Sequence, residues 1–205
     1  MTFEAGRKPR QARSQARVER ILDAAATQVA AAGVESVTMA GIGAASGSAP
    51  GSLYQYFPNR NSLIEALAER EASRVEACVA DALANWQGCE PATPASLIDA
   101  LLPPLLTIYR ERPAWGELLH ALARGGQPGV VEQRLDAHIE ARLSKALCRL
   151  DPAAKPDRRG MAAAILLDLG HAGLLFAQRS ESEAVYDEVR RALNAYLDDW
   201  CQRGA

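Results

Sequence analysis

The residues best suited to chemistry at a surface lie in one short segment, SAPGSLYQYFPNRNSL, at positions 48–63. An exposed ring at Tyr54 or Tyr56 can contact thymine methyl groups, and its hydroxyl can contact a phosphate. Ser52 can bond a base edge or a phosphate, and Gly51 lets the backbone come close. Because two tyrosines two positions apart cannot both face one core, we expect at least one to be exposed. The alternative is that both rings pack between helices, as aromatic side chains often do.

Other reactive residue types form no catalytic pattern. The chain has no serine nucleophile elbow, no HExxH motif and no phosphate-binding glycine loop. His120 and His138 have no second metal ligand at i+3 or i+4. Asp168 and His171 lie three positions apart, a spacing that favours a satisfied polar pair over a reaction. We therefore predict no catalytic residue, no cofactor and no metal site.

Composition narrows the class of protein. The 205 residues are 48% hydrophobic, enough to bury a core. The four cysteines are scattered without a CxxC pair, which favours a reducing cytosol over a disulfide framework. The N-terminus has no apolar signal segment, and the longest apolar run, residues 161–176, is expected to be too short to span a bilayer. These features predict a soluble cytoplasmic protein without a membrane segment.

Charge is distributed unevenly along the chain. The net charge is −2, yet residues 1–60 hold seven Lys/Arg and only four Asp/Glu. The remaining residues hold sixteen basic and twenty-one acidic side chains. A basic head on an acidic body indicates that the head meets a polyanion, and the equally weighted alternative is a solvated, disordered arm.

The apolar periodicity predicts an all-α protein with a helix-turn-helix near its start. From Ser14 to Ala32, apolar residues recur at the spacing of one buried helix face, and Gly33 stands where a left-handed C-cap belongs. Thr38 is a good N-cap for a second helix, Met39 to about Ala45, and a third helix is expected from Pro50 to Phe57. Two short helices around a glycine turn are typical of a motif whose second helix fits the DNA major groove.

Longer helices are predicted for the remainder. Asn59 should cap a helix that reaches about Trp86, and further helices are expected over residues 95–112, 114–124, 130–150, 158–179 and 183–202. The helix over residues 95–112 should be interrupted at Pro103-Pro104. The expected domains are a basic N-terminal arm (1–13), a helix-turn-helix domain (14–58) that forms a three-helix bundle, and a larger helical body (59–205).

Residues 18–67 resemble the N-terminal domain of the TetR family of transcriptional regulators. The matching features are ILDAA, the Gly33-Val34 turn, Thr38-Met39 before Ile42, and GSLYQYFPNR followed by SLIEAL. The combination of LYxxF with F-P-x-[KR]-x-x-L at this distance from the N-terminus is more specific than a generic helix-turn-helix. The acidic helical body agrees in length and order with the dimerisation and ligand-binding domain of that family.

The resemblance implies a set of DNA contacts. Contacts of the recognition helix fall on Pro50, Gly51, Ser52, Tyr54, Gln55 and Tyr56, and phosphate contacts on Thr38 and Arg60. The basic residues from Arg7 to Arg17, which include Lys8, Arg10 and Arg13, resemble an arm that some members lay into the minor groove. Family members often have Ser-Lys where this chain has Ala49-Pro50, and a basic or polar residue where it has Ala40. The arm is therefore expected to carry more of the affinity.

The resemblance also implies a homodimer through residues 158–179 and 183–202. Small residues at Ala164, Gly170 and Gly173 would allow the helices to approach closely, although an ordinary hairpin within one chain is the alternative. A twofold dimer would set its two recognition helices ~34 Å apart, to read a palindromic operator.

A ligand pocket is expected between the central helices. The candidate pocket residues are Trp86, Tyr109, Trp115, His120 and His138, for each of which core packing is the more frequent role. We expect a repressor that a small-molecule effector releases from double-stranded operator DNA. The alternatives are a helical small-molecule binder without DNA binding and, as the weaker one, an enzyme.

Overall fold

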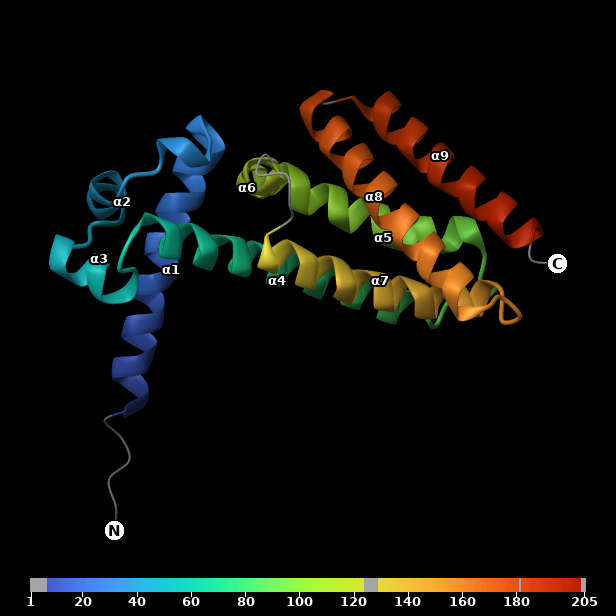
Figure 1. Ribbon diagram of the computed structural model, residues 1–205, viewed down its shortest axis with the longest axis horizontal. Coiled ribbons are helices and arrows are strands. Elements are labelled where there is room, and N and C mark those ends of the chain that lie inside the picture. Colours follow the sequence, from blue (N-terminus) through green and yellow to red (C-terminus); the bar gives the residue numbers. More distant parts are fainter. Residues whose placement is uncertain (1–6, 124–128, 181, 204–205) are drawn as a thin grey trace, which may run out of the picture.

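The computed structural model describes residues 7–123, 129–180 and 182–203, and the regular secondary structure in these ranges is entirely helical. In chain order the elements are α1 (Arg7–Ala32), a 3₁₀ turn η1 (Val34–Ser36), α2 (Met39–Ser46), α3 (Pro50–Tyr56), α4 (Arg60–Trp86), α5 (Pro94–Glu111), α6 (Pro113–Ala123), α7 (Val130–Leu150), α8 (Pro156–Ser180) and α9 (Glu183–Gln202). Figure 1 shows a small N-terminal domain built on α1 to α3, from which α4 leads into a larger body. The predicted all-α architecture is confirmed.

The N-terminal domain packs around its own hydrophobic core. Ile21, Ala25 and Val29 recur along one face of α1 and are fully buried. Ile42 of α2 and Leu53 of α3 close this core from the other side. The buried stripe of α1 thus fixes how α2 and α3 lie on the rest of the domain.

Local signals in the sequence set the ends of the two short helices. The Thr38 hydroxyl caps α2 by accepting a hydrogen bond from the Gly41 backbone N–H at 3.1 Å. Gly47 ends α2 in the left-handed region, with φ 64°, where a residue with a side chain is disfavoured. Asn59 and Ser62 form a capping box at the start of α4. The turn between α2 and α3 therefore has the predicted chemistry.

The body is a bundle of α4 to α9 with a separate core. Helix α4 packs against α5 and α7, α7 packs against α8, and α8 packs against both α5 and α9 (Figure 1). The core contains Leu97, Leu147 and Leu197, all fully buried. The two cores meet at α6, which contributes Trp115 to the body and Leu118 to the N-terminal domain.

Two predicted features of the helices are wrong. Helix α1 begins at Arg7 rather than at the expected Ser14, so the backbone of residues 7–13 forms its first turns. Helix α5 continues through Pro103-Pro104, although proline removes a backbone N–H donor. Buried neighbours on either side, Leu102 and Leu106, anchor α5 in the core, and this packing keeps the helix intact.

Helix α8 is the one described helix that is long and apolar enough, by length and composition alone, to cross a membrane. It has 25 residues, because it extends beyond the apolar run 161–176 at both ends, and the expectation of too short a span is therefore wrong. Only 33% of its most apolar window is buried within the chain, although α5, α7 and α9 all pack against it. An exposed apolar face on α8 therefore needs an explanation.

Candidate nucleic-acid interface and ligand cavity

Helix α3 presents a continuous surface to solvent. Gly51, Tyr54 and Gln55 are exposed, and the Tyr54 side chain has 52% of its surface free. Leu53 and Phe57, four positions apart, are buried in the domain core on the opposite face. The expectation that at least one tyrosine is exposed is confirmed, and the exposed one is Tyr54.

Two other polar residues of α3 are tied to α1. The Tyr56 hydroxyl lies 3.0 Å from the Ser14 hydroxyl in a hydrogen bond, and the Tyr56 ring packs against the domain core. Arg17 donates from Nη1 to the Ser52 hydroxyl at 3.0 Å. These contacts bring the guanidinium of Arg17 to the edge of the exposed face of α3.

Arg60 bonds partners within its own domain. Its Nε donates to the carbonyl of Val37 at 3.0 Å and its Nη2 to the carbonyl of Val34 at 2.7 Å. The same Nη2 forms an ion pair with Glu35 at 3.1 Å. Because these bonds hold η1 and the following turn against α4, we assign Arg60 a positioning role.

The remaining predicted DNA contacts differ in how far the structure describes them. Thr38 is exposed beside the first turn of α2, and Arg13 is exposed on α1. The side chains of Arg7, Lys8, Arg10 and Pro50 lie outside the described residues, although their backbone is helical.

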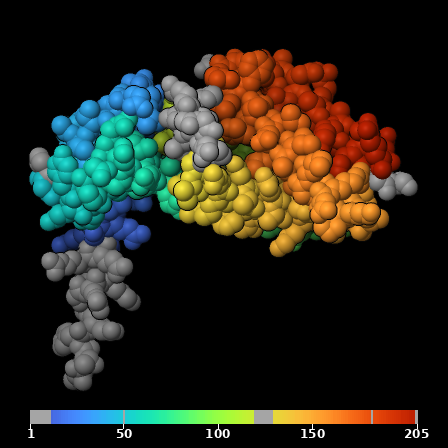
Figure 2. Space-filling model, viewed as in Figure 1, coloured from blue at the N-terminus to red at the C-terminus, as the bar shows by residue number. Residues whose placement is uncertain are grey.

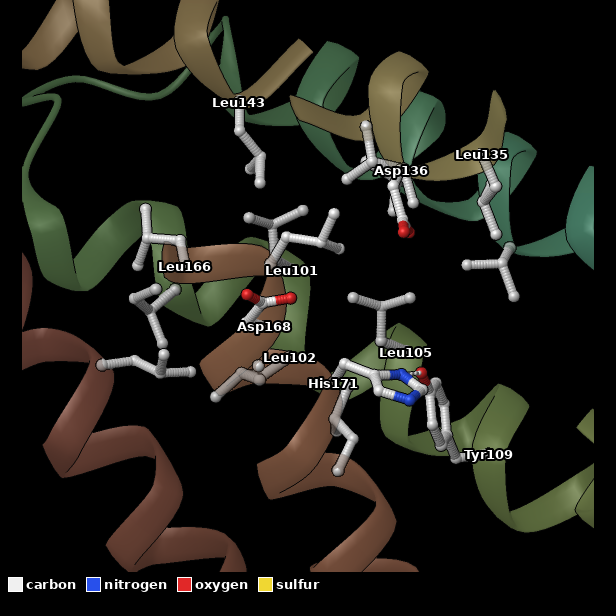
Figure 3. Close-up of a pocket in the computed structure, with 18 of the residues that line it drawn as sticks. Leu101, Leu102, Leu105, Tyr109, Leu135, Asp136, Leu143, Leu166, Asp168 and His171 are labelled. Carbon is white, nitrogen blue, oxygen red and sulfur yellow. Dashed lines mark hydrogen bonds between the residues drawn. The ribbon is translucent and has the colours of Figure 1, made fainter. Parts of the chain in front are cut away.

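A large cavity lies in the body between α4, α5, α7 and α8. Its empty volume is about 990 Å³, part of it open to solvent, and most of its lining is leucine, isoleucine or valine. Figure 3 shows Leu101, Leu105, Leu135 and Leu166 around this space. A mostly apolar lining with a few polar groups is typical of small-molecule sites.

The polar groups of the cavity are mostly acidic. The carboxylates of Asp136 on α7 and Asp168 on α8 both point into it (Figure 3), and Glu132 also lines it. Burial, with the nearby carboxylates of Glu132, Glu140 and Asp168, raises the pKa of the Asp136 carboxyl to about 6. Burial also raises the pKa of Glu132. Among the described lining residues, carboxyl groups therefore outnumber basic side chains, of which His171 is the one example.

A hydrogen-bonded pair borders the cavity beside these carboxylates. The Tyr109 hydroxyl lies 2.6 Å from Nδ1 of His171, and Figure 3 shows the two rings side by side. Burial raises the pKa of the Tyr109 phenol, an effect that the neighbouring Trp115 indole partly opposes. Among the described residues, however, the buried Nε1 of Trp115 donates no hydrogen bond of normal geometry.

Of the five predicted pocket residues, Tyr109 and Trp115 line the cavity. Trp86 does not: it is buried elsewhere in the body core, where its Nε1 donates to Ser96 and Arg149 lies over its ring. His138 is exposed and pairs with Glu76 across the outer surface, and the side chain of His120 lies outside the described residues.

Sequence reasoning missed the acidic lining. Asp168 and His171 were recognised as a pair on one helix, which places both on the same face, but not as cavity residues. Asp136 stands between Leu135 and Ile139 on the inner face of α7, a polar residue within an apolar stripe. That interruption is the signal in the sequence that could have identified it.

Helix α6 connects the cavity to the N-terminal domain. Trp115 lines the cavity, whereas Ala114 and Leu118 on the same helix pack into the N-terminal core. A buried carboxylate, Glu71 of α4, lies at this junction and bonds Arg74 at 2.7 Å and Arg112 at 3.4 Å. A displacement of α6 would therefore alter both the cavity and the core of the N-terminal domain.

Glycines on α8 have roles within the chain. A Cβ on Gly173 would lie 2.5 Å from Val189 of α9 in the same chain, so Gly173 allows the close approach of the α8–α9 hairpin. A Cβ on Gly170, which lines the cavity, would meet nothing within 4 Å. Gly173 was expected to mark the dimer interface, and this close intrachain contact means that its substitution would not report on dimerisation alone.

The unexplained exposure on α8 comes from large apolar side chains. Met161, Ile165, Leu169 and Phe176 are 37–69% exposed, and their spacing places them along one face of the helix. Figure 2 shows α8 (orange) open at the surface between α7 and α9.

Within the described ranges, no group of three or more His, Cys, Asp or Glu could hold a metal ion.

Comparison with known proteins supports both halves of this description. A family model of bacterial regulatory proteins of the tetR family matches residues 21–67. A second model, the tetracyclin repressor-like C-terminal domain, matches residues 93–197. A search of curated proteins found no match.

Several solved structures share the fold. A TetR-family transcriptional regulator from Streptomyces coelicolor has a TM-score of 0.67 at 21% identity, covering 89% of this chain and 98% of that chain. A transcriptional regulator from Rhodococcus sp. RHA1 has a TM-score of 0.70 at 19% identity, with 90% and 96% covered. A TetR transcriptional regulator from Legionella pneumophila has a TM-score of 0.67 at 17% identity, with 86% and 95% covered. Since the two family models together span most of the chain, it belongs to the TetR family of DNA-binding transcriptional regulators.

Proposed function

We propose that the protein is a homodimeric repressor that binds a palindromic operator through α3 and is released when an effector occupies the cavity of the body. The observation that carries this proposal is the exposed face of α3, held on a rigid domain whose core is continuous with α6. Tyr54, Gln55 and Gly51 would meet bases, while Thr38, Arg13 and Arg17 would meet phosphates. A protein of this kind acts in the cytoplasm and carries out no catalysis.

Dimerisation through α8 and α9 accounts for the exposed apolar stripe on α8. A second copy would cover Met161, Ile165, Leu169 and Phe176 by packing its own α8 and α9 against them. Exposed alanines on α9, Ala184, Ala192 and Ala195, would let the partner helices approach closely. Such a twofold arrangement would place two copies of α3 on one face of DNA, ~34 Å apart.

Release by an effector would use α6 as the connecting element. An effector against Trp115 would shift α6, and Ala114 and Leu118 would carry the shift into the core beneath α2 and α3. The ion pairs of Glu71 with Arg74 and Arg112 would limit the positions that α6 can adopt relative to α4. By linkage, an effector that weakens operator binding must itself bind the operator-bound protein less tightly.

A gel-shift titration with the DNA upstream of the protein's own gene tests the proposal. The protein should shift this DNA in the presence of excess non-specific competitor, and Tyr54→Ala should remove the shift. The matched control is Val130→Ala, an exposed side chain at the start of α7 outside α3, α8 and α9, which should leave the shift unchanged. If the competitor abolishes every shift while the folded protein still binds small molecules, the chain is a ligand-binding protein without operator recognition.

A further inference from the structure

The side chains that line the cavity in the body are mostly apolar, and most of the polar ones are acidic. Three carboxyl groups border it, those of Glu132, Asp136 and Asp168. None of the described residues that line it is a lysine or an arginine, and the one basic side chain is His171. Because the rest of the wall is mostly hydrocarbon, a ligand in the cavity meets few polar groups other than these carboxyls.

Two polar atoms at this site have no hydrogen-bond partner of normal geometry among the described residues. They are the buried Oε2 of Glu132, an acceptor, and the buried Nε1 of Trp115, a donor. Trp115 is only 2% exposed and lines the cavity. Buried polar groups are normally bonded, so the Glu132 oxygen is available to a ligand that carries a hydrogen-bond donor or a positive charge.

The aromatic side chains of the cavity lining favour a cationic ligand. The indole of Trp115 and the phenol ring of Tyr109 both border the cavity, and aromatic faces attract cations. An anionic ligand would meet three carboxyl groups and a single basic side chain, that of His171, at a cost that the apolar contacts would have to offset. A neutral ligand would leave the carboxylates unpaired.

We propose that the cavity binds an organic cation, an ammonium group on an extended hydrocarbon body, with the charged group between Asp136 and Asp168 and the hydrocarbon among the leucines of α5, α7 and α8. This inference deepens the proposed function, on which it rests for the role of the cavity as the effector site. The carboxylates select the charge, and the hydrocarbon wall supplies affinity for the apolar body.

Isothermal titration calorimetry of the full chain, free of DNA, tests the proposal with three probes of matched length. Decyltrimethylammonium should bind at least about tenfold more tightly than 1-decanol, a ratio that corresponds to ~1.4 kcal/mol, and decanoate should bind most weakly. Equal affinity for the three probes, or tighter binding of decanoate, would overturn the assignment.

Variants locate the charge. Asp136→Asn and Asp168→Asn should each reduce the affinity for decyltrimethylammonium about tenfold and leave the affinity for 1-decanol unchanged. Asp81→Asn removes the same charge from an exposed position of α4 that does not line the cavity, and should change neither affinity. An unchanged preference for the cation in both cavity variants would show that the cation binds elsewhere.

The pH dependence supplies an independent readout. The affinity for decyltrimethylammonium, whose charge is fixed, should fall as the pH is lowered from about 8 to about 5, because the Asp136 carboxyl, with a pKa of about 6, becomes protonated. Glu132, Glu140 and Asp168 face the same region, and protonation of any of them, or of His171, would weaken the cation in the same direction. A pH-independent affinity would contradict the proposal.

The outcomes separate this inference from the proposed function. If the cation binds the cavity but leaves operator binding unchanged, the ligand class stands and the mechanism of release fails. If instead 1-decanol or decanoate releases the operator and binds more tightly than the cation, the release mechanism stands and the ligand class is wrong.

Discussion

Tyr54 and Tyr56 illustrate how differently two neighbouring residues of one short helix are used. Tyr54 is 52% exposed, whereas Tyr56 packs on the domain core and bonds Ser14 through its hydroxyl. Arg60 likewise bonds the backbone of the η1 region rather than facing solvent. Exposed residues and residues that bond within the domain thus alternate along residues 52–60.

The prediction for Tyr54 concerns sequence discrimination. Tyr54→Ala should lose ~1–3 kcal/mol of discrimination at the bases that the ring contacts, and should leave the thermal unfolding midpoint unchanged because the ring is exposed. Tyr54→Phe keeps the ring and should retain the part of the discrimination that comes from thymine methyl groups. Binding to operator and to scrambled DNA would be compared by fluorescence anisotropy. A Tyr54→Ala protein that unfolds would instead make Tyr54 a core residue.

Asp136 should make stability depend on pH. Its pKa is raised from 3.8 to about 6 in the folded protein, so the folded state binds its proton more tightly than the unfolded state does. This contribution to stability is fully present below pH 3.8 and is lost as the pH rises through about 6. Asp136→Asn should therefore unfold at a higher temperature than the native protein at neutral pH, and the difference should shrink towards pH 4. An identical pH profile for both proteins, in calorimetry, would remove the basis for this prediction.

At the scale of elements, the sequence predicted what depends on local signals. The caps at Thr38 and Asn59 and the turn at Gly47 fix α2, α3 and the start of α4 close to the expected positions. The continuation of α5 through Pro103-Pro104 could not be predicted, because packing of distant helices offsets the local cost of proline.

The same distinction applies to the candidate sites. The exposed face of α3 follows from helical periodicity within one segment, whereas the cavity joins residues of α5, α7 and α8 that are far apart in sequence. Tyr109 and Trp115 were identified because they are aromatic. Trp86, of the same type, belongs to the core, because its position relative to the other helices decides its role.

Arg60 connects two elements, and its substitution separates positioning from DNA contact. Arg60→Ala removes two bonds to backbone carbonyls, at 3.0 Å and 2.7 Å, and the ion pair with Glu35. The free energy of unfolding should fall by ~2 kcal/mol. Arg60→Lys keeps the charge but loses the forked geometry, and should also be destabilised. An unfolding free energy equal to that of the native protein, with a salt slope of DNA binding reduced by ~1, would assign Arg60 to a phosphate.

At the scale of the whole molecule, the exposed stripe on α8 predicts the assembly. Leu169→Glu places a charge in the middle of this stripe, where the native side chain is 46% exposed, and should shift sedimentation from dimer to monomer. Val130→Glu is the matched control, because Val130 is 83% exposed at the start of α7, outside the stripe. Two dimeric variants would place the interface elsewhere on the surface.

The most direct test of the whole account is the dependence of operator affinity on the spacing between half-sites. A rigid dimer that reads DNA with two copies of α3 requires half-sites about one helical turn apart, on one face of the duplex. Inserting half a turn, about five base pairs, between them should reduce affinity to the level of non-specific DNA, and Leu169→Glu should bind both spacings equally weakly. If the native protein binds the original and the lengthened operator with equal affinity, its subunits read DNA independently and the proposed dimer is wrong.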